Sequence, residues 1–226
     1  MAPFLFEGSL MAASSEIAFR RSIGAAGLAA VLFILLFSFY STGLFDFWWW
    51  MSFNILVLCG LGFIMDRKYI ARLAADIKKS GLKKIILGLL SAFLLYGVFF
   101  IGESLAGILP AFAREGIEGV YAFKEGVPVI RMVLLMALII GPGEEIFWRG
   151  YLQQTWQMRL GKTGGWLICT ALYTLIHVPS GNVVLVAAAL TAGLFWGGLY
   201  HLTRSAILVA VSHTAWDILV FILLPF

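Results

Sequence analysis

GPGEEIFWR, residues 141–149, places two adjacent carboxylates and an arginine inside a segment that is otherwise apolar enough to cross a bilayer. Ionised side chains are costly in hydrocarbon and are rarely kept there without a function. On a helix, Glu145 and Arg149 lie four residues apart and can pair, whereas Glu144 has no charged partner in its own segment. Pro142 and the glycines on either side of it predict a break in the helix, whose new N-terminus would favour an ionised carboxylate.

The composition of the chain identifies its class. Of the 226 residues, 62% are hydrophobic and 12% are charged, and the mean hydropathy is +0.97. A soluble domain carries roughly 25% charged residues. The apolar runs are continuous rather than alternating, which favours membrane helices over a β-barrel. The sequence therefore predicts an all-α, polytopic membrane helix bundle, an integral multi-pass protein in contact with lipid, which would lie in the cell membrane if the source is a prokaryote.

About seven transmembrane helices are expected, at residues 23–40, 44–65, 85–109, 128–157, 165–178, 183–202 and 205–224. Three spans form an N-terminal segment, residues 1–128, with a basic loop at 66–84 that contains an amphipathic surface helix. Four spans form a C-terminal core, residues 129–226, and the two parts make one integrated membrane domain. The first span is expected to be retained, because no positively charged n-region precedes it.

The basic residues indicate the orientation of the chain. They lie at the ends of the apolar runs, as membrane topology requires, which argues against a nucleic-acid partner. With a cytoplasmic N-terminus, three basic residues face outward: Arg114, Lys124 and Arg131. Twelve face inward: Arg20, Arg21, Arg67, Lys68, Arg72, Lys78, Lys79, Lys83, Lys84, Arg159, Lys162 and Arg204. This asymmetry places the N-terminus in the cytoplasm.

Several other features are predicted to be structural. The tryptophans at positions 48–50 open the second span and are expected to anchor it at the lipid headgroups. Residues 110–127 contain Pro110, three glycines and mixed charges, which favour an external loop. Cys59 and Cys169 lie in apolar runs, as is typical of buried thiols.

Two further polar pairs lie four residues apart in apolar segments: Tyr173 with His177, and His213 with Asp217. Together with the glutamate motif, they are predicted to converge on one buried polar site. Glu144 would act there as a general base on a water molecule held by the two imidazoles. Asp217 would orient His213 or hold the water, and the Tyr173 hydroxyl would meet a polar group or simply pack.

The same residues leave the question of a metal open. Glu145 and Arg149 are expected to support the site as a buried ion pair or as a donor to a developing oxyanion. Zinc would also be satisfied, with Glu144, His177, His213 and Asp217 as its ligands. The signature His-Glu-x-x-His of soluble zinc proteases is absent, so water bound without a metal remains the alternative.

The three motifs, in order, resemble those of the CAAX prenyl protease and bacteriocin-processing family, which includes the type II CAAX proteases and their Abi-like relatives. The matching residues are Glu144-Glu145-x-x-x-Arg149, Tyr173-x-x-x-His177 and His213-x-x-x-Asp217, and the resemblance covers about residues 130–220. It implies an intramembrane endopeptidase in which Glu144 activates water. His177, His213 and Asp217 would complete the site, with Glu145 and Arg149 in support.

Two residues depart from the pattern of that family. Tyr173 stands where phenylalanine is common, which should matter little, and Asp217 stands where asparagine is frequent, which makes metal binding more plausible. The family is described both as metal-dependent and as a metal-free glutamate protease.

The predicted function is therefore hydrolysis of a peptide bond near the cytoplasmic face. The substrate would be membrane-associated: a prenylated C-terminus, a leader peptide or another tethered peptide. Two alternatives are a small secondary transporter or proton-coupled carrier that uses the buried Glu, His and Asp side chains, and a catalytically idle scaffold or immunity protein.

Overall fold

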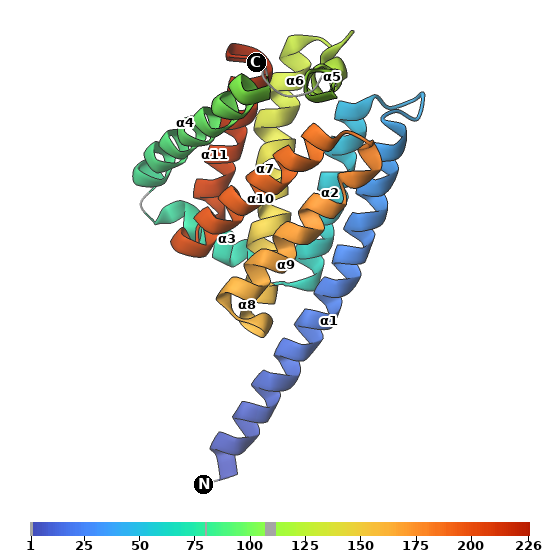
Figure 1. Cartoon of the computed structure of the whole chain (residues 1–226). Helices are drawn as coiled ribbons and strands as arrows, with labels where there is room; N and C mark the ends of the chain where they lie inside the picture. Colours follow the sequence, from blue (N-terminus) through green and yellow to red (C-terminus); the bar gives the residue numbers. More distant parts are fainter. Residues whose placement is uncertain (1, 80, 107–111) are drawn as a thin grey trace.

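The structure is a computed structural model that describes residues 2–79, 81–106 and 112–226. Within these ranges the chain is helical and contains no strand, which confirms the predicted all-α bundle (Figure 1). The longer helices are α1 (Ala2–Phe39), α2 (Phe47–Met65), α4 (Gly81–Ala106), α10 (Val183–Thr203) and α11 (Ala206–Ile218), which continues as a π-helical segment to Leu223. The shorter ones are α3 (Tyr69–Lys78), α5 (Phe112–Tyr121) and α9 (Lys162–Leu175).

Membrane spans can be assigned by length and composition. Five segments are long and apolar enough to cross: Glu16–Phe39, Phe47–Met65, Gly81–Leu105, Val183–Thr203 and Ala206–Leu223. A sixth arises if Phe112–Lys124 and Val129–Leu160, which meet at 96°, form one bent span. Helix α9 has 14 residues, a length of about 21 Å against a hydrocarbon core of about 30 Å. The chain is thus an integral multi-pass membrane protein, and the count of seven spans stays a prediction.

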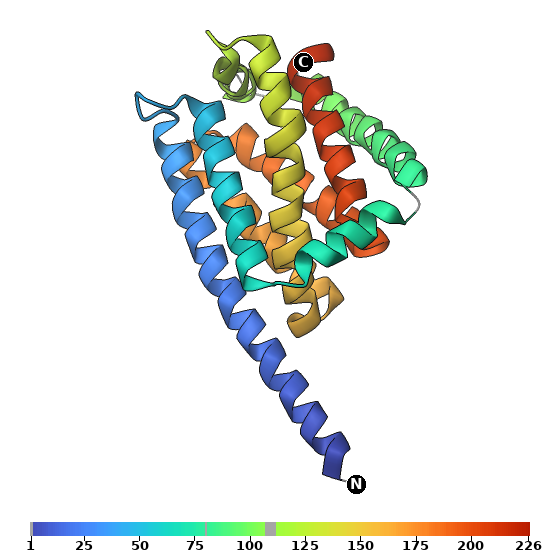
Figure 2. The same ribbon diagram turned by 180° about the vertical axis from the view of Figure 1, so that it is seen from behind.

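The connections between helices gather at two ends of the bundle. One end, which we call the basic end, holds the N-terminal part of α1, helix α3, the junction of α8 (Gln154–Leu160) with α9, and the α10–α11 junction (Figures 1 and 2). The loop between α1 and α2, helix α5 and the C-terminus lie at the opposite, C-terminal end. The surface helix predicted in the basic loop is confirmed as α3. The expected loop at 110–127 instead contains α5 and a 3₁₀ turn, Ala122–Lys124, while Pro110 lies outside the described residues.

The helix that carries the glutamates is continuous, so the break predicted at Pro142 is wrong. It runs through α6 (Val129–Leu135), a π-helical segment Met136–Ile140, α7 (Gly141–Glu145), a second π-helical segment Ile146–Gln153, and α8 (Gln154–Leu160). The N–H of Gly141 donates to the Met136 carbonyl, five residues back. Pro142 has no backbone N–H to donate, and a π-turn at this point lets the helix continue without it. No free helix N-terminus therefore faces the glutamates.

The glycines beside Pro142 serve close packing instead. A Cβ atom on Gly141 would lie 2.4 Å from Oγ1 and 3.0 Å from Cα of Thr214 in α11, and one on Gly143 would lie 2.2 Å from Cγ2 of Ile55 in α2. Glycine at these two positions lets α7 approach both neighbouring helices. The glycines on either side of Pro142 do mark a special position in the sequence. The reason is close packing against α11 and α2 rather than a break in the helix.

Helix α3 is fastened to the glutamate-bearing helix by Tyr69. Its hydroxyl donates to the Ile146 carbonyl at 2.5 Å, over Gly150, where any Cβ atom would overlap the phenol. Burial raises the pKa of Tyr69, so the hydroxyl stays protonated and remains a donor.

The tryptophan cluster at the start of α2 is not a simple headgroup anchor. Trp48 is 3% exposed and its Nε1 donates to the Phe123 carbonyl at 2.8 Å, whereas Trp49 is 43% exposed. Only part of the cluster can face lipid, because the helix points its first tryptophan into the bundle. The two cysteines are buried or partly buried, and each thiol donates to a backbone carbonyl, of Gly143 and of Trp148 respectively.

We expect Gly141→Ala to destabilise the protein by about 1–3 kcal/mol, because the new methyl group would be forced against the Thr214 backbone. Thermal unfolding in detergent measures this. Gly60→Ala, where no atom lies within 4 Å of the added Cβ, is the matched control and should be neutral or slightly stabilising. Equal melting temperatures for the two variants would contradict the packing argument.

Candidate active site

Glu144 lies near the middle of the glutamate-bearing helix and is buried. Its Oε2 accepts a hydrogen bond from the Tyr173 hydroxyl of α9 at 2.9 Å. The expected polar partner of Tyr173 is thus Glu144 itself. The hydroxyl that replaces the common phenylalanine therefore contacts the residue proposed as the base, and the expectation that this replacement matters little does not fit the geometry.

Glu145 bridges two helices. Its Oε1 accepts from Nη1 of Arg149 at 2.9 Å, as the four-residue spacing predicted, and lies 2.7 Å from Nδ1 of His213 in α11. All three side chains are buried. The Arg149 guanidinium also lies over the rings of Tyr173 and Trp196, at 4.9 and 5.8 Å. Because these groups are buried, removing one of them would leave another charge unpaired, at a large cost in stability.

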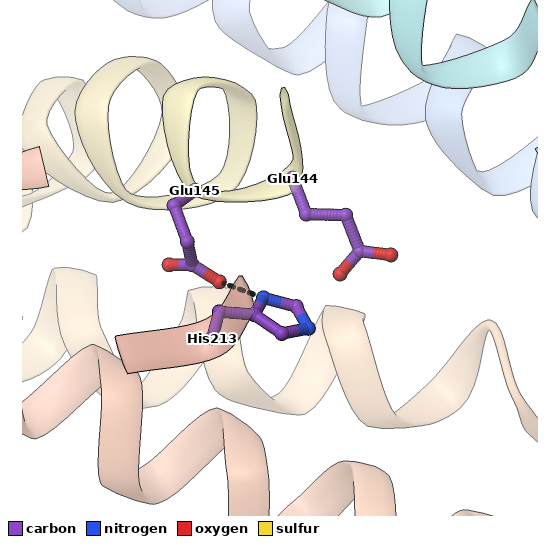
Figure 3. Close-up of side chains that lie close together, drawn as sticks. All are labelled: Glu144, Glu145 and His213. Atoms are coloured by element: carbon purple, nitrogen blue, oxygen red, sulfur yellow. Dashed lines mark hydrogen bonds and ion pairs between the residues drawn. The ribbon is translucent and has the colours of Figure 1, made fainter. Parts of the chain in front are cut away.

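His213 is held on three sides. Nδ1 faces Glu145, Nε2 lies 3.5 Å from Oδ1 of Asp217, and the ring of Trp196 in α10 stacks on the imidazole at 3.6 Å and 25°. Figure 3 shows the carboxylates of Glu144 and Glu145 on different sides of the imidazole, with the Glu145 bond at Nδ1. Nε2 is therefore the nitrogen left to act toward Glu144 and a reacting molecule.

His177 reaches the site from the turn after α9. Its Nδ1 lies 2.7 Å from the Tyr173 carbonyl and its ring contacts Phe37 at 4.4 Å. A donor bond to that carbonyl fixes the tautomer and leaves Nε2 able to contact water or substrate. The histidine is buried, like Glu144 and His213.

One pocket of about 190 Å³ collects the predicted residues. Glu144, His177, His213 and Asp217 line its wall together with Tyr173 and Trp196. Glu145 and Arg149 do not line the pocket; they lie behind it and hold His213. The structure therefore brings Glu144 and two of the polar pairs, Tyr173 with His177 and His213 with Asp217, to one pocket, with the third pair behind it.

The donors closest together differ from the predicted metal ligands. Glu144, Glu145 and His213 each offer an atom within 4.8 Å of the other two. His177 and Asp217 belong to the same pocket but not to this close group. The contact between Glu145 and His213, and the stacking of Trp196, escaped the sequence analysis. Each joins segments far apart in the chain, and Trp196 lies in an apolar helix that carries no motif.

Residues 125–219 match the family model for the type II CAAX prenyl endopeptidases, described as Rce1-like. We call this part of the chain the Rce1-like domain, after the family model that it matches. It begins four residues before α6 and extends past Asp217, so it contains all three motifs and confirms the resemblance seen in the sequence. No curated protein and no solved structure matches the chain. The Rce1-like domain therefore carries every residue proposed for the chemistry.

We expect Tyr173→Phe to lower the rate of peptide cleavage roughly tenfold, since a hydrogen bond to a charged group contributes about 1.5–3 kcal/mol and 1.4 kcal/mol corresponds to a factor of ten. Initial rates of the purified variant measure this. Tyr200→Phe removes a buried hydroxyl from α10, outside the pocket lining, and should leave the rate unchanged. A fully active Tyr173→Phe variant would mean that the hydroxyl only packs.

Arg149→Ala should destabilise the protein by about 3–5 kcal/mol, because it leaves the buried Glu145 carboxylate without its cation. Arg149→Lys keeps a positive charge and should retain part of both stability and activity. Thermal unfolding and cleavage assays on the same preparations measure the two effects. If alanine and lysine behaved alike, the ion pair could not be what supports this region.

Proposed function

We propose that the chain is an intramembrane endopeptidase that hydrolyses a peptide bond in a membrane-associated substrate. The observation that carries the proposal is the placement of Glu144 and His213 on the wall of one buried pocket, within an Rce1-like domain. Endopeptidase activity is the property of the family; the assignment of roles to residues rests on the contacts described above.

Glu144 is the general base in this proposal. It takes a proton from a water molecule held between its carboxylate and Nε2 of His213, and the water oxygen attacks the carbonyl carbon of the scissile bond. As the C–N bond breaks, the proton passes from Glu144 to the departing amine. The Tyr173 hydrogen bond orients the carboxylate while this transfer occurs.

The His213 ring stabilises the charge that develops on the carbonyl oxygen: with Nδ1–H donating to Glu145, a second proton on Nε2 makes it an imidazolium that donates to this oxygen. Donors that are already oriented lower the barrier because they need no reorganisation during the reaction. His213 is oriented by Glu145, by Asp217 and by the stacked Trp196. His177, whose Nδ1–H donates to the Tyr173 carbonyl, presents a lone pair at Nε2 and accepts a hydrogen bond from the attacking water. Glu145 and Arg149 are positioning residues in this scheme, since they act through His213 rather than on the substrate.

The donor set also fits a divalent cation such as zinc. A histidine that binds a metal usually donates its other ring N–H to a carboxylate, as Nδ1 of His213 is placed to do to Glu145. One buried oxygen of Glu145, Oε2, lacks a hydrogen-bond partner among the described residues. Glu144 and His213 would hold the ion, with Glu145 beside them, and the ion would lower the pKa of its bound water.

Replacing Glu144 with glutamine tests the proposal. The variant preserves shape but cannot accept the proton, so we expect cleavage to fall at least a hundredfold. Cleavage of membrane-anchored reporter peptides by the purified protein is measured by mass spectrometry, and thermal unfolding confirms that the variant is folded. Glu118→Gln, on the exposed surface of α5, is the matched control. His177→Ala and His213→Ala should also abolish cleavage.

The same cleavage assay distinguishes a protease from the two alternatives, a carrier and a scaffold. A carrier would move its solute and would cleave nothing with either glutamate or glutamine at position 144. A scaffold would show no cleavage that depends on Glu144. Unchanged cleavage by Glu144→Gln would remove this residue from the chemistry.

A further inference from the structure

The pocket opens away from the basic end. Apart from the site residues, its walls come from those parts of the helices that lie near the C-terminal end (Figure 1). Phe37 is near the end of α1, Trp48 is at the start of α2, Phe99 is in the last part of α4, and Val184 is at the start of α10. Phe226 is the last residue of the chain. Space around the site therefore extends toward the C-terminal end.

The opposite direction is filled with side chains. Below Glu144 on the same helix, Trp148 and Leu152 are fully buried, and Nε2 of Gln153 donates to the Gly197 carbonyl of α10 at 2.8 Å. One turn further, Nε1 of Trp156 donates to Oγ of Ser22 in α1 at 2.9 Å. These contacts close the bundle between the site and the basic end.

A second hollow lies beside the site pocket, toward the side of the bundle. It has a volume of about 400 Å³, lies between α4, α5 and α10, and is lined almost wholly by apolar side chains. It shares five lining residues with the site pocket: Phe99, Ile117, Val184, Ala188 and Phe226. The two hollows therefore lie side by side, with these five residues in the wall that they share, and together we call them the lateral groove. Exposed apolar residues such as Val98 and Phe112 lie at its outer wall.

We propose that the substrate reaches Glu144 through the lateral groove, as an extended apolar segment of a bilayer-inserted peptide, from the leaflet at the C-terminal end. The inference rests on the proposed function. The molecule whose peptide bond lies at Glu144 must continue into the space next to that site, and the groove offers apolar walls to an apolar chain. The basic end is blocked by packed side chains, so a peptide cannot approach from that side.

The charge distribution identifies this leaflet. Twelve basic residues lie in segments at the basic end and three in segments at the other, which places the basic end in the cytoplasm. The groove therefore opens in the outer half of the bilayer. This replaces the expectation of cleavage near the cytoplasmic face. The substrate class becomes peptides inserted from the outer leaflet, such as apolar segments of exported chains, rather than cytoplasmic lipidated C-termini.

Contact quenching of a bimane fluorophore tests the route without any cleavage. Bimane is attached to single cysteines at Ala188 in the groove, at Ile101 on the exposed face of α4 near the C-terminal end, and at Leu82 on α4 near the basic end, with Cys59 and Cys169 replaced by alanine. The probe is a ten-residue leucine–alanine peptide with one central tryptophan, whose helix of about 15 Å enters only one leaflet. It is added to right-side-out or inverted membrane vesicles, and the same peptide with phenylalanine is the control.

In right-side-out vesicles we expect saturable quenching at Ala188, stronger than the linear, collisional quenching at Ile101, and none at Leu82. In inverted vesicles only Leu82 should be quenched. Quenching at Ala188 from the inverted side, or no more quenching there than at Ile101, would overturn the proposal. Quenching of Ile101 in inverted vesicles would overturn the leaflet assignment.

A second experiment measures peptide cleavage after a bulky residue is placed in the groove. Ala188→Trp should slow cleavage of a membrane-anchored reporter at least tenfold, whereas Ala171→Trp, on an exposed position of α9, should not. Equal rates for the two variants would count against the route. Glu144→Gln should leave the quenching unchanged, so loss of the proposed catalysis and failure of the proposed route give different results.

Discussion

A single carboxylate oxygen of Glu145 holds both the Arg149 guanidinium and the His213 imidazole inside the bundle, and the geometry of the site depends on it. In a medium where unpaired charge is very costly, the three groups are arranged so that each satisfies another. The consequence is an imidazole whose orientation is set before substrate arrives. Glu144, one residue earlier, is left to face the pocket, and Tyr173 is its hydrogen-bond donor among the described residues.

The surrounding fold makes that bridge possible. Glycine at position 141 allows α7 and α11 to approach closely enough for Glu145 to reach His213. Trp196 covers the imidazole from α10, and Tyr69 ties α3 to the glutamate-bearing helix. The π-turns before and after α7 carry the helix past Pro142 and set which residues face inward. Short-range packing thus determines the chemistry available at the site.

The first part of the chain contributes to the pocket although the family match begins only at residue 125. Phe37, Trp48 and Met51 line the pocket from α1 and α2, and Phe99 lines both hollows from α4. The Rce1-like domain supplies the chemical groups, and the preceding helices supply much of the apolar wall. The motifs all lie after residue 128, but the pocket is lined by helices from both sides of that boundary.

The sequence by itself determined the helical membrane class and the polar pairs, because hydrophobicity and the four-residue spacing are local properties of a chain. It also determined which residues would line the pocket: Glu144, His177, His213 and Asp217. Only the tertiary structure decided that the helix continues through Pro142, that Trp48 is buried, that Glu145 contacts His213, and toward which end the pocket opens. These depend on contacts between segments distant in sequence, and no local pattern specifies which of several helices will pack against a given face.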